Sequence, residues 1–434
     1  MEKRWLLKLG LVVLVMGLAS LNMAGKGCFS SDTAISGSSY AEQPFPIPDY
    51  TLAPPYNLIY YGCSIAKGDF NGDGIDDLAV AAVWEGVFVY HGSNLGFSST
   101  PTWINGGYQL DSRYARSLVT GDFNGDGFDD LAVGADKYTN GETEEGGVFV
   151  YYGSNSGLST TPNWVGESNQ IGSYYGFSVG AGDFNNDGFD DLVVGAIFYS
   201  NGETEEGVAF VYYGSVSGLS ATPNWTVESN QSQMHYGYSF DKGDFNGDGF
   251  ADLLIAADYP ERLFVYNGSA SGLSVTPSWT TNGFGGRAGD FNGDGFDDLA
   301  VGIMISGNTS KISVSYGSAS GLSVPLNWPV FYEESRLPGL GGVGDFNKDG
   351  FDDLVVSAPS ATNPEGDEGK VWIHYGSTSG LSTTFSWTGE SNQPLANYGE
   401  TAAGDFNKDG FDDLAVGADG YNREGRVFIY YHIQ

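Results

Sequence analysis

The sequence predicts an all-β protein, a seven-bladed β-propeller with four-stranded blades. Two observations carry this prediction. The motif Gly-Asp-Phe-Asn-Gly-Asp-Gly-Phe-Asp-Asp-Leu, or a near copy, occurs seven times in 434 residues, and its first aspartates lie 46–61 residues apart. Short apolar, β-branched runs recur at the same places around each copy, as expected of strands. A period of this length corresponds to one supersecondary unit, and seven such units arranged around an axis form a propeller.

Each period contains four candidate strands. The first precedes the motif, as in residues 175–181, and the second follows it, as in residues 191–196. The third is rich in valine and aromatic residues, as in residues 147–153, 208–213 and 371–375. Turns of the form Gly-Ser-x-Ser-Gly-Leu-Ser, as in residues 153–159, lead from the third strand to the fourth. The fourth strand is expected around a recurring tryptophan: Trp164, Trp225, Trp279, Trp328 and Trp387.

The last period has no fourth strand of its own, because the chain ends soon after the third-strand run at residues 427–431. Residues 45–53 precede the first period and read as a strand. We expect them to complete the last blade, which would close the ring and remove an exposed sheet edge. The propeller domain is therefore predicted to span residues 45–434.

The repeated motif is a loop of hard oxygen ligands. In the first copy Asp69, Asn71 and Asp73 occupy alternate positions, Gly74 permits a turn, and Asp77 follows at position 9. Calcium accepts six to eight oxygens in flexible geometry, including a backbone carbonyl at position 7. An EF-hand is excluded because it needs a glutamate at position 12, where this chain has Val80 in a strand-like run. The sequence predicts up to seven Ca²⁺ ions.

The predicted ligands occupy positions 1, 3, 5, 7 and 9 of each loop. They are Asp69, Asn71, Asp73, Ile75 and Asp77; Asp122, Asn124, Asp126, Phe128 and Asp130; Asp183, Asn185, Asp187, Phe189 and Asp191; Asp244, Asn246, Asp248, Phe250 and Asp252; Asp290, Asn292, Asp294, Phe296 and Asp298; Asp345, Asn347, Asp349, Phe351 and Asp353; Asp405, Asn407, Asp409, Phe411 and Asp413.

Two positions of the loop are not expected to bind metal. Position 8 is Ala251 in the fourth copy and aspartate elsewhere, so its side chain is not predicted to be a ligand. Position 4 varies among glycine, asparagine and lysine, and we expect it to point to solvent. The alternative to metal binding is a set of Asx-turns without a cation. Three carboxylates within nine residues repel one another, which favours the metal.

The N-terminal residues indicate secretion. Residues 1–24 combine Lys3 and Arg4 with an apolar run and small residues, as in a signal peptide. Residues 25–44 are small and polar and read as a flexible tether. We expect a secreted or cell-surface protein. Cys28 could carry a lipid anchor while Cys63 is buried in the first strand, or the two cysteines could form a disulfide.

On these motifs the chain resembles the FG-GAP repeats of the integrin alpha-chain propeller and of bacterial surface proteins. The resemblance covers residues 45–434 and rests on the Tyr-Gly-x-Ser-Val segment at 175–179, the Asp-Phe-Asn-Gly-Asp-Gly loop and the Leu-Val-Val-Gly-Ala strand at 192–196. It implies calcium in the first hairpin of a blade and ligand binding on the opposite face. The chain departs from integrins because all seven periods carry the loop and because an integrin's later domains and membrane span are missing.

A partner is therefore expected on the face opposite the metal loops. That face should carry Glu-rich loops at 140–145, 201–206 and 365–368 and the interblade segments 167–170, 228–231 and 390–393. The predicted function is adhesion or recognition of an extracellular protein or glycan, and the alternative is a lectin, since fungal lectins of similar fold bind sugars between blades. The recurring tryptophans are interpreted as packing residues. The candidate ligand-binding residues are Glu167, Asn169, Tyr174, Tyr175, Glu228 and Tyr236.

No catalytic constellation is visible, and the protein is not predicted to be an enzyme. The four histidines, His91, His235, His374 and His432, fall in different periods. A calcium-dependent polysaccharide lyase is the remaining enzymatic alternative. The net charge of −36 opposes binding to nucleic acid and to anionic membranes. Membrane attachment is expected only through a lipid at Cys28, and the chain is expected to be a monomer.

Overall fold

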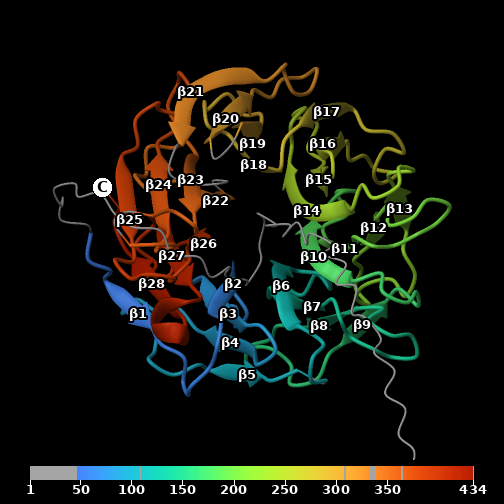
Figure 1. The fold of residues 1–434 in the computed structure, drawn as a ribbon, viewed down its shortest axis with the longest axis horizontal. Coiled ribbons are helices and arrows are strands. Elements are labelled where there is room, and N and C mark those ends of the chain that lie inside the picture. Colours follow the sequence, from blue (N-terminus) through green and yellow to red (C-terminus); the bar gives the residue numbers. More distant parts are fainter. Residues whose placement is uncertain (1–45, 108, 307–308, 333–338, 363–364, 434) are drawn as a thin grey trace, which may run out of the picture.

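The computed structural model describes residues 46–107, 109–306, 309–332, 339–362 and 365–433. Within these ranges the chain forms seven four-stranded antiparallel sheets arranged around a central axis (Figure 1). The first strand of each blade lies nearest the axis, beside the first strands of both neighbouring blades. The predicted seven-bladed, all-β propeller is confirmed.

The strands of six blades follow one another along the chain. Blade by blade they are β2 (Tyr61–Gly68), β3 (Asp77–Ala82), β4 (Gly86–Tyr90) and β5 (Trp103–Asn105); β6 (Tyr114–Gly121), β7 (Asp130–Ala135), β8 (Gly147–Tyr151) and β9 (Trp164–Glu167); β10 (Tyr175–Gly182), β11 (Asp191–Ala196), β12 (Val208–Tyr212) and β13 (Trp225–Glu228); β14 (Tyr236–Gly243), β15 (Asp252–Asp258), β16 (Glu261–Tyr266) and β17 (Trp279–Asn282); β18 (Gly285–Gly289), β19 (Asp298–Ser306), β20 (Thr309–Ser315) and β21 (Leu326–Tyr332); β22 (Gly339–Gly344), β23 (Asp353–Ala358), β24 (Lys370–His374) and β25 (Trp387–Glu390).

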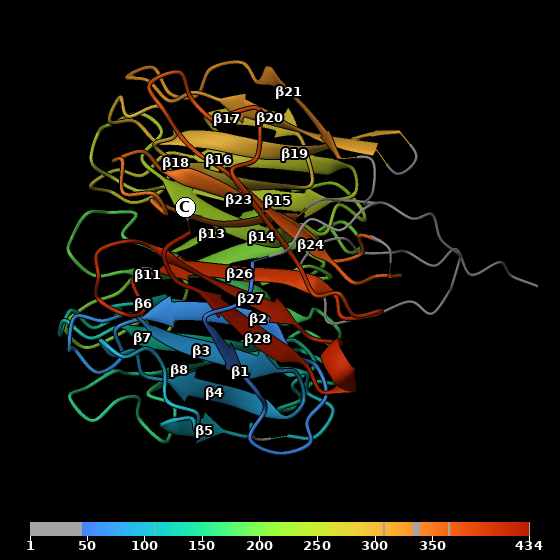
Figure 2. The ribbon, with the colours of Figure 1, turned by 90° about the vertical axis from the view of Figure 1, so that its left-hand side faces the viewer.

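The seventh blade combines both ends of the described chain. It contains β26 (Tyr398–Gly404), β27 (Asp413–Ala418) and β28 (Arg426–Tyr430), with a short 3-10 helix η1 (Tyr421–Arg423) before β28. Its outer strand is β1 (Tyr50–Leu52), which lies within the segment expected to close the ring and pairs antiparallel with β28 (Figure 2). The Tyr431 N–H also donates to Asp49 Oδ2 at 2.7 Å. These contacts join the two ends of the described chain and leave β28 without a free edge.

The hydrophobic core is divided among the blade interfaces. Second strands such as Asp-Leu-Ala-Val-Gly-Ala in β7 are buried along their whole length, because small and β-branched side chains pack against a neighbouring blade on each face. Each pair of adjacent blades shares one apolar cluster, for example Leu131 and Val133 of blade 2 with Val87 and Val89 of blade 1. The phenylalanine at position 2 of every metal loop, such as Phe70, is buried in one of these clusters.

Several predictions concern residues outside the described ranges: the signal peptide at 1–24, the tether at 25–44 and Cys28. Cys63 is described, and it is buried in β2 with its thiol 3.8 Å from the Ala81 carbonyl oxygen. Over the ranges that the structure covers, no helix has the length and apolar character needed to span a bilayer.

Candidate functional site

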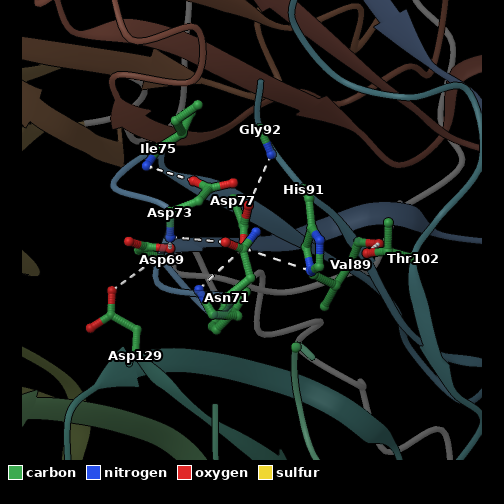
Figure 3. A network of polar contacts seen from close by, with 12 residues as sticks. Asp69, Asn71, Asp73, Ile75, Asp77, Val89, His91, Gly92, Thr102 and Asp129 are labelled. Atoms are coloured by element: carbon green, nitrogen blue, oxygen red, sulfur yellow. Dashed lines mark hydrogen bonds and ion pairs between the residues drawn. The ribbon is translucent and has the colours of Figure 1, made fainter. Parts of the chain in front are cut away.

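Each predicted metal loop connects the first and second strands of a blade and folds around its first aspartate. In loop 1, Asp69 Oδ1 accepts the Gly72 N–H and Asp69 Oδ2 accepts the Gly74 N–H, both at 2.7 Å. Asp73 Oδ1 accepts the Ile75 N–H at 2.9 Å (Figure 3). Gly74 has a φ of 75°, in the left-handed region that glycine adopts without strain. Position 6 is glycine with positive φ in all seven loops, as predicted.

The aspartate at position 9 is buried in every loop. Asp77 is 0% exposed; its Oδ2 accepts the Phe70 N–H at 3.1 Å and its Oδ1 accepts the Gly92 N–H at 2.9 Å. Burial raises the pKa of Asp77 to about 8. Burial likewise raises the pKa of the other six position-9 aspartates to about 7 or 8. A buried carboxylate without a cation is therefore costly at neutral pH.

Position 8 has a role that the sequence analysis missed: its aspartate joins adjacent blades. Asp129 Oδ2 of loop 2 accepts the Asp69 N–H of loop 1 at 2.8 Å, while the Asp129 N–H donates to the Asp69 carbonyl at 3.1 Å (Figure 3). The backbone bond recurs at all seven interfaces, including the one between blades 7 and 1. The carboxylate bond recurs at five others and is missing only where Ala251 replaces the aspartate. The inference that position 8 is not a ligand agrees with this use of its side chain.

Position 4 is exposed, as predicted, but it also contacts the next blade, which was not predicted. Lys408 of loop 7 donates to the Asp73 carbonyl of loop 1 at 2.9 Å. Lys348 of loop 6 lies over the Phe411 ring of loop 7, with its Nζ 4.9 Å from the ring centroid. These lysines adopt positive φ, where most of the loops have glycine.

The donor set of the loops fits a hard divalent cation, since each loop supplies carboxylate, amide and carbonyl oxygens. Three of the predicted ligand oxygens are buried without a hydrogen-bond partner: Asn185 Oδ1, Asp409 Oδ2 and Asp413 Oδ1. Among the described residues, no group of three or more His, Cys, Asp or Glu side chains is arranged as a metal cluster. The carboxylates instead accept backbone N–H groups. The occupancy of the loops by calcium therefore stays a prediction.

The opposite ends of the blades carry the interblade segments expected to meet a partner, but much of their polar chemistry is structural. In segment 167–170, Ser168 Oγ donates to the Glu145 carbonyl at 2.9 Å. The Gln170 amide donates to the Ser200 carbonyl and accepts the Ser200 N–H, at 3.0 and 2.8 Å. The Gln109 amide bonds the Thr139 backbone in the same way. The Gln393 amide accepts the Asn422 N–H at 2.9 Å and donates to Asn422 Oδ1 at 2.7 Å. These three glutamines join an interblade segment to the following blade.

Three of the predicted ligand contacts, Glu167, Glu228 and Asn169, are at least partly exposed, and the two glutamates already accept hydrogen bonds within the protein. Glu167 Oε2 accepts a hydrogen bond from Asn140 Nδ2 at 2.8 Å, and Glu228 Oε2 accepts one from Asn201 Nδ2 at 2.9 Å. Asn169 is exposed and has a φ of 56°, a left-handed conformation that asparagine tolerates in turns. The structure therefore gives these three residues a local reason to be present.

The prediction that Tyr175 and Tyr236 are exposed contacts is wrong. Both are buried, at 0% and 1% exposure, because a bulge after each tyrosine turns its ring into the blade interface. The Tyr175 hydroxyl donates to Tyr212 at 2.9 Å. The Tyr236 hydroxyl donates to Tyr266 at 2.7 Å. Neither residue is available to a ligand.

Tyr174 is the predicted contact that lines an open site. A pocket of about 600 Å³ lies between blades 2 and 3, with Glu144, Gln170, Tyr174, Phe198, Ser200 and Glu205 among its walls. The Tyr174 ring packs edge to face on Phe198, with centroids 4.9 Å apart, and its hydroxyl donates to Glu144 Oε2 at 3.3 Å. The Arg113 guanidinium lies over the same ring, 5.2 Å from its centroid. The pocket thus combines an aromatic wall with two glutamates.

The recurring tryptophans pack between blades, as predicted. Trp164 Nε1 donates to the Ser220 carbonyl of the following blade at 3.0 Å, and its ring lies edge to face on Tyr212, with centroids 4.9 Å apart. Trp225 and Trp279 donate to equivalent serine carbonyls. The structure adds Trp103 to this set, with a bond to the Ser159 carbonyl at 3.1 Å. A sugar-stacking role for these rings is not supported by their contacts.

Two family models of one kind of repeat match the sequence of this chain. The model described as "FG-GAP repeat" matches residues 62–96, 114–151, 175–212, 340–374 and 398–430. The model described as "FG-GAP-like repeat" matches residues 244–301. The matched segments span the first three strands of five blades and the metal loops of blades 4 and 5.

Curated relatives are similar over part of their length. Integrin alpha-5 of Xenopus laevis is 28% identical over 242 residues, which cover 52% of this chain and 23% of the integrin. Integrin alpha-PS2 of Drosophila melanogaster is 32% identical over 222 residues, covering 48% and 16%. Human phosphatidylinositol-glycan-specific phospholipase D is 31% identical over 219 residues, covering 45% and 26%. The matched region thus spans about a quarter or less of these relatives.

A solved structure of similar fold is BBS1N in complex with ARL6DN, soaked with lead. It has a TM-score of 0.53 and 12% sequence identity, and the match covers 89% of this chain and 96% of that chain. At this identity the likeness concerns the fold alone.

Proposed function

Because this chain is an FG-GAP repeat protein related to the integrin alpha chains, we propose that it is a calcium-stabilised recognition module. It binds an extracellular protein or glycan on the face opposite the metal loops. It acts outside the cell as a secreted or surface-attached monomer, with residues 25–44 as a tether behind a signal peptide at 1–24. Proteins with unrelated ligands share this fold, so the fold does not identify the ligand, and the proposal depends on the residues of the site.

Calcium has a structural role in this proposal. The ligands are the oxygens at positions 1, 3, 5, 7 and 9 of each loop, and the ion compensates the buried carboxylate at position 9. The orphaned oxygens Asn185 Oδ1 and Asp413 Oδ1 support this role, because buried acceptors without partners are rare in folded proteins. When bound, the ion supplies positive charge beside carboxylates that otherwise repel one another.

Calorimetry on the purified chain, with thermal melts in calcium and in chelator, tests the metal part of the proposal. We expect about seven ions per chain and a large fall in melting temperature on chelation. Binding of few ions, or equal melting temperatures with and without chelator, would show that the aspartates serve only as turn-forming residues.

The observation that carries the recognition role is the pocket between blades 2 and 3. Its lining includes the partly exposed side chains of Tyr174 and Phe198 together with Glu144 and Glu205. Aromatic residues that combine an apolar face with a polar tip are common at protein interfaces and suit sugar rings as well. The metal-loop face repeats nearly the same sequence in every blade, whereas the place of Tyr174 is taken by Arg113 in the preceding blade and by His235 in the following one.

Binding to arrays of glycans and to a panel of extracellular proteins, each with and without chelator, tests the recognition part. Tyr174→Ala should reduce binding by about tenfold or more, as expected for an aromatic anchor. Leu95→Ala is the matched control, because Leu95 is 98% exposed in the turn after β4, at the metal-loop end of blade 1. A glycan signal without a protein signal would identify a lectin. Equal binding by the Tyr174 variant and the wild type would exclude this pocket as the site.

A further inference from the structure

Two successive links on the face opposite the metal loops each expose one large aliphatic side chain. Leu110, in the link before β6, is 89% exposed, and Ile171, in the link before β10, is 67% exposed. Each follows a glutamine whose amide bonds the backbone of the following blade, so the two residues occupy equivalent places one blade apart. In the links before β14 and β26 this place is taken by Ser232 and Pro394. The exposed aliphatic pair therefore belongs to the links of blades 2 and 3.

Ile171 also lines the pocket between blades 2 and 3, together with Tyr174 and Phe198. The two aromatic rings pack edge to face with their centroids 4.9 Å apart, and both side chains are partly exposed. Gly172 lines the same pocket without adding a side chain. The volume of about 600 Å³ is in the range of ligand sites in proteins. The apolar part of the pocket thus consists of one aliphatic and two aromatic side chains.

Several polar side chains that line this pocket already have partners within the protein. The Gln170 amide bonds the Ser200 backbone through both its oxygen and its nitrogen. Glu144 Oε1 accepts a hydrogen bond from Lys137 Nζ at 3.0 Å, and Glu144 Oε2 accepts one from the Tyr174 hydroxyl at 3.3 Å. The hydroxyl groups of a sugar would have to compete with these bonds, and a polar group that loses its partner on binding costs free energy. An apolar ligand leaves the bonds in place.

Positive charge beside the pocket opposes a cationic ligand. The Arg113 guanidinium and Lys137 Nζ each lie 5.2 Å from the centroid of the Tyr174 ring, which therefore already interacts with two cations. Lys137 also pairs with Glu144 at 3.0 Å. The side chain of Glu205, the other lining glutamate, is 43% exposed, so its charge remains in contact with water. An uncharged side chain fits this environment better than an ammonium or a guanidinium group.

We propose that the pocket receives an apolar, uncharged side chain of a partner protein, and that Leu110 extends the contact to the preceding link. This inference rests on the proposed recognition role of this face and names the class of its ligand. A protein partner in a typical complex covers about 800 Å² of each surface, which is more than one pocket. The centre of such an interface is apolar and aromatic, and polar groups surround it. An apolar side chain gains free energy on leaving water and needs no hydrogen bond from the pocket.

The chain offers a matched control for a substitution at Ile171. Val216 is 86% exposed in the turn after β12, at the metal-loop end of blade 3. Because both side chains are exposed, Ile171→Asp and Val216→Asp should both fold, and thermal melts of the two variants check this. The first variant places a charge in the pocket, and the second places the same charge at the other end of the blade.

The test selects a displayed library of random peptides on the purified full chain in calcium. Peptides about twelve residues long reach about 40 Å when extended. We expect the recovered peptides to share an apolar residue whose replacement by alanine weakens binding about tenfold or more. Ile171→Asp should weaken binding of the same peptides about tenfold or more, Leu110→Asp should weaken it less, and Val216→Asp should leave it unchanged. The same proteins are applied to a glycan array.

Four outcomes would overturn the proposal: no recovered peptide, peptides whose essential residue is charged, binding unchanged in Ile171→Asp, or an equal loss in Val216→Asp. Unchanged binding in Leu110→Asp would overturn the part that includes Leu110. The glycan array separates this inference from the proposed function. A glycan signal that falls in Ile171→Asp, without peptide binding, refutes the protein ligand and leaves the recognition role of the pocket standing. If neither peptides nor glycans bind through the pocket, its recognition role is refuted as well.

Discussion

The interblade role of position 8 can be tested by removing the carboxylate of Asp129. Asp129→Ala removes the acceptor of the Asp69 N–H, a bond of 2.8 Å, and leaves only the reciprocal backbone bond between loops 1 and 2. The interface between blades 3 and 4, where Ala251 stands at this position, has the same single bond. The variant should therefore fold.

The expected magnitude follows from two opposing effects. A hydrogen bond to a charged group contributes about 1.5–3 kcal/mol. Against this, burial raises the pKa of Asp129, and the nearby carboxylates of Asp190, Asp76 and Asp69 raise it further. Removing the Asp129 carboxylate therefore also removes an unfavourable charge. We expect Asp129→Ala to lower the free energy of unfolding by about 1–2 kcal/mol.

Urea denaturation in calcium, together with hydrogen exchange at the Asp69 amide, measures this effect. Asp129→Asn is the matched control, because its side-chain oxygen can still accept the Asp69 N–H without a charge, and its loss should be about half as large. Equal stability of Asp129→Ala and wild type, or equal losses for the alanine and asparagine variants, would refute the hydrogen-bond argument.

Three further predictions concern other contacts. Ala251→Asp should supply the missing acceptor for the Asp183 N–H and raise the urea midpoint, by about 1 kcal/mol in unfolding free energy. Burial lowers the pKa of His374 to about 4 from 6.5, so the folded protein binds fewer protons than the unfolded chain between these values. The contribution of His374 to stability should therefore fall as the pH drops through this window, by up to about 3 kcal/mol, whereas the buried position-9 aspartates act in the opposite direction. In urea titrations at several pH values, the unfolding free energy of the wild type relative to His374→Gln should fall by that amount. Tyr175→Phe should cost about 1–2 kcal/mol in the same assay by leaving the Tyr212 hydroxyl buried without its donor.

The blades could be predicted from the sequence because their signals are local. The loop residues from Asp69 to Asp77 and the buried run that follows them lie within one short segment, so spacing alone identifies a hairpin. The role of position 8 could not be predicted in this way. Asp129 contacts Asp69, which is 60 residues away in the chain, and only the ring places the two loops side by side.

The error at Tyr175 has a different cause, and the sequence did contain a signal against it. The Tyr-Gly pair at the start of a first strand resembles an exposed link, but the bulge at Gly176 turns the ring inward. Blades 5 and 6 have no tyrosine at the start of the first strand, and there the third strand ends in Ser315 and His374 rather than tyrosine. In the other five blades both tyrosines are present, and their hydroxyl groups bond to each other.

The residue before the first strand carries the strongest remaining argument for recognition on the face opposite the metal loops. In five blades this residue is Tyr60, Arg113, Tyr174, His235 or Asn397, and each has a φ between 51° and 58°. A left-handed backbone costs a non-glycine residue roughly 1–2 kcal/mol, and glycine would remove that strain. The five side chains differ in charge and shape, whereas the metal loops at the other end of the same strands are nearly identical. Arg113 pairs with the buried Asp136 at 2.6 Å, His235 lies 3.4 Å from Asp258, and Asn397 donates to Asp419 at 2.9 Å, so these side chains have partners within the protein. Strained residues are often retained at functional sites, and Tyr174 is the member of this set that lines the pocket.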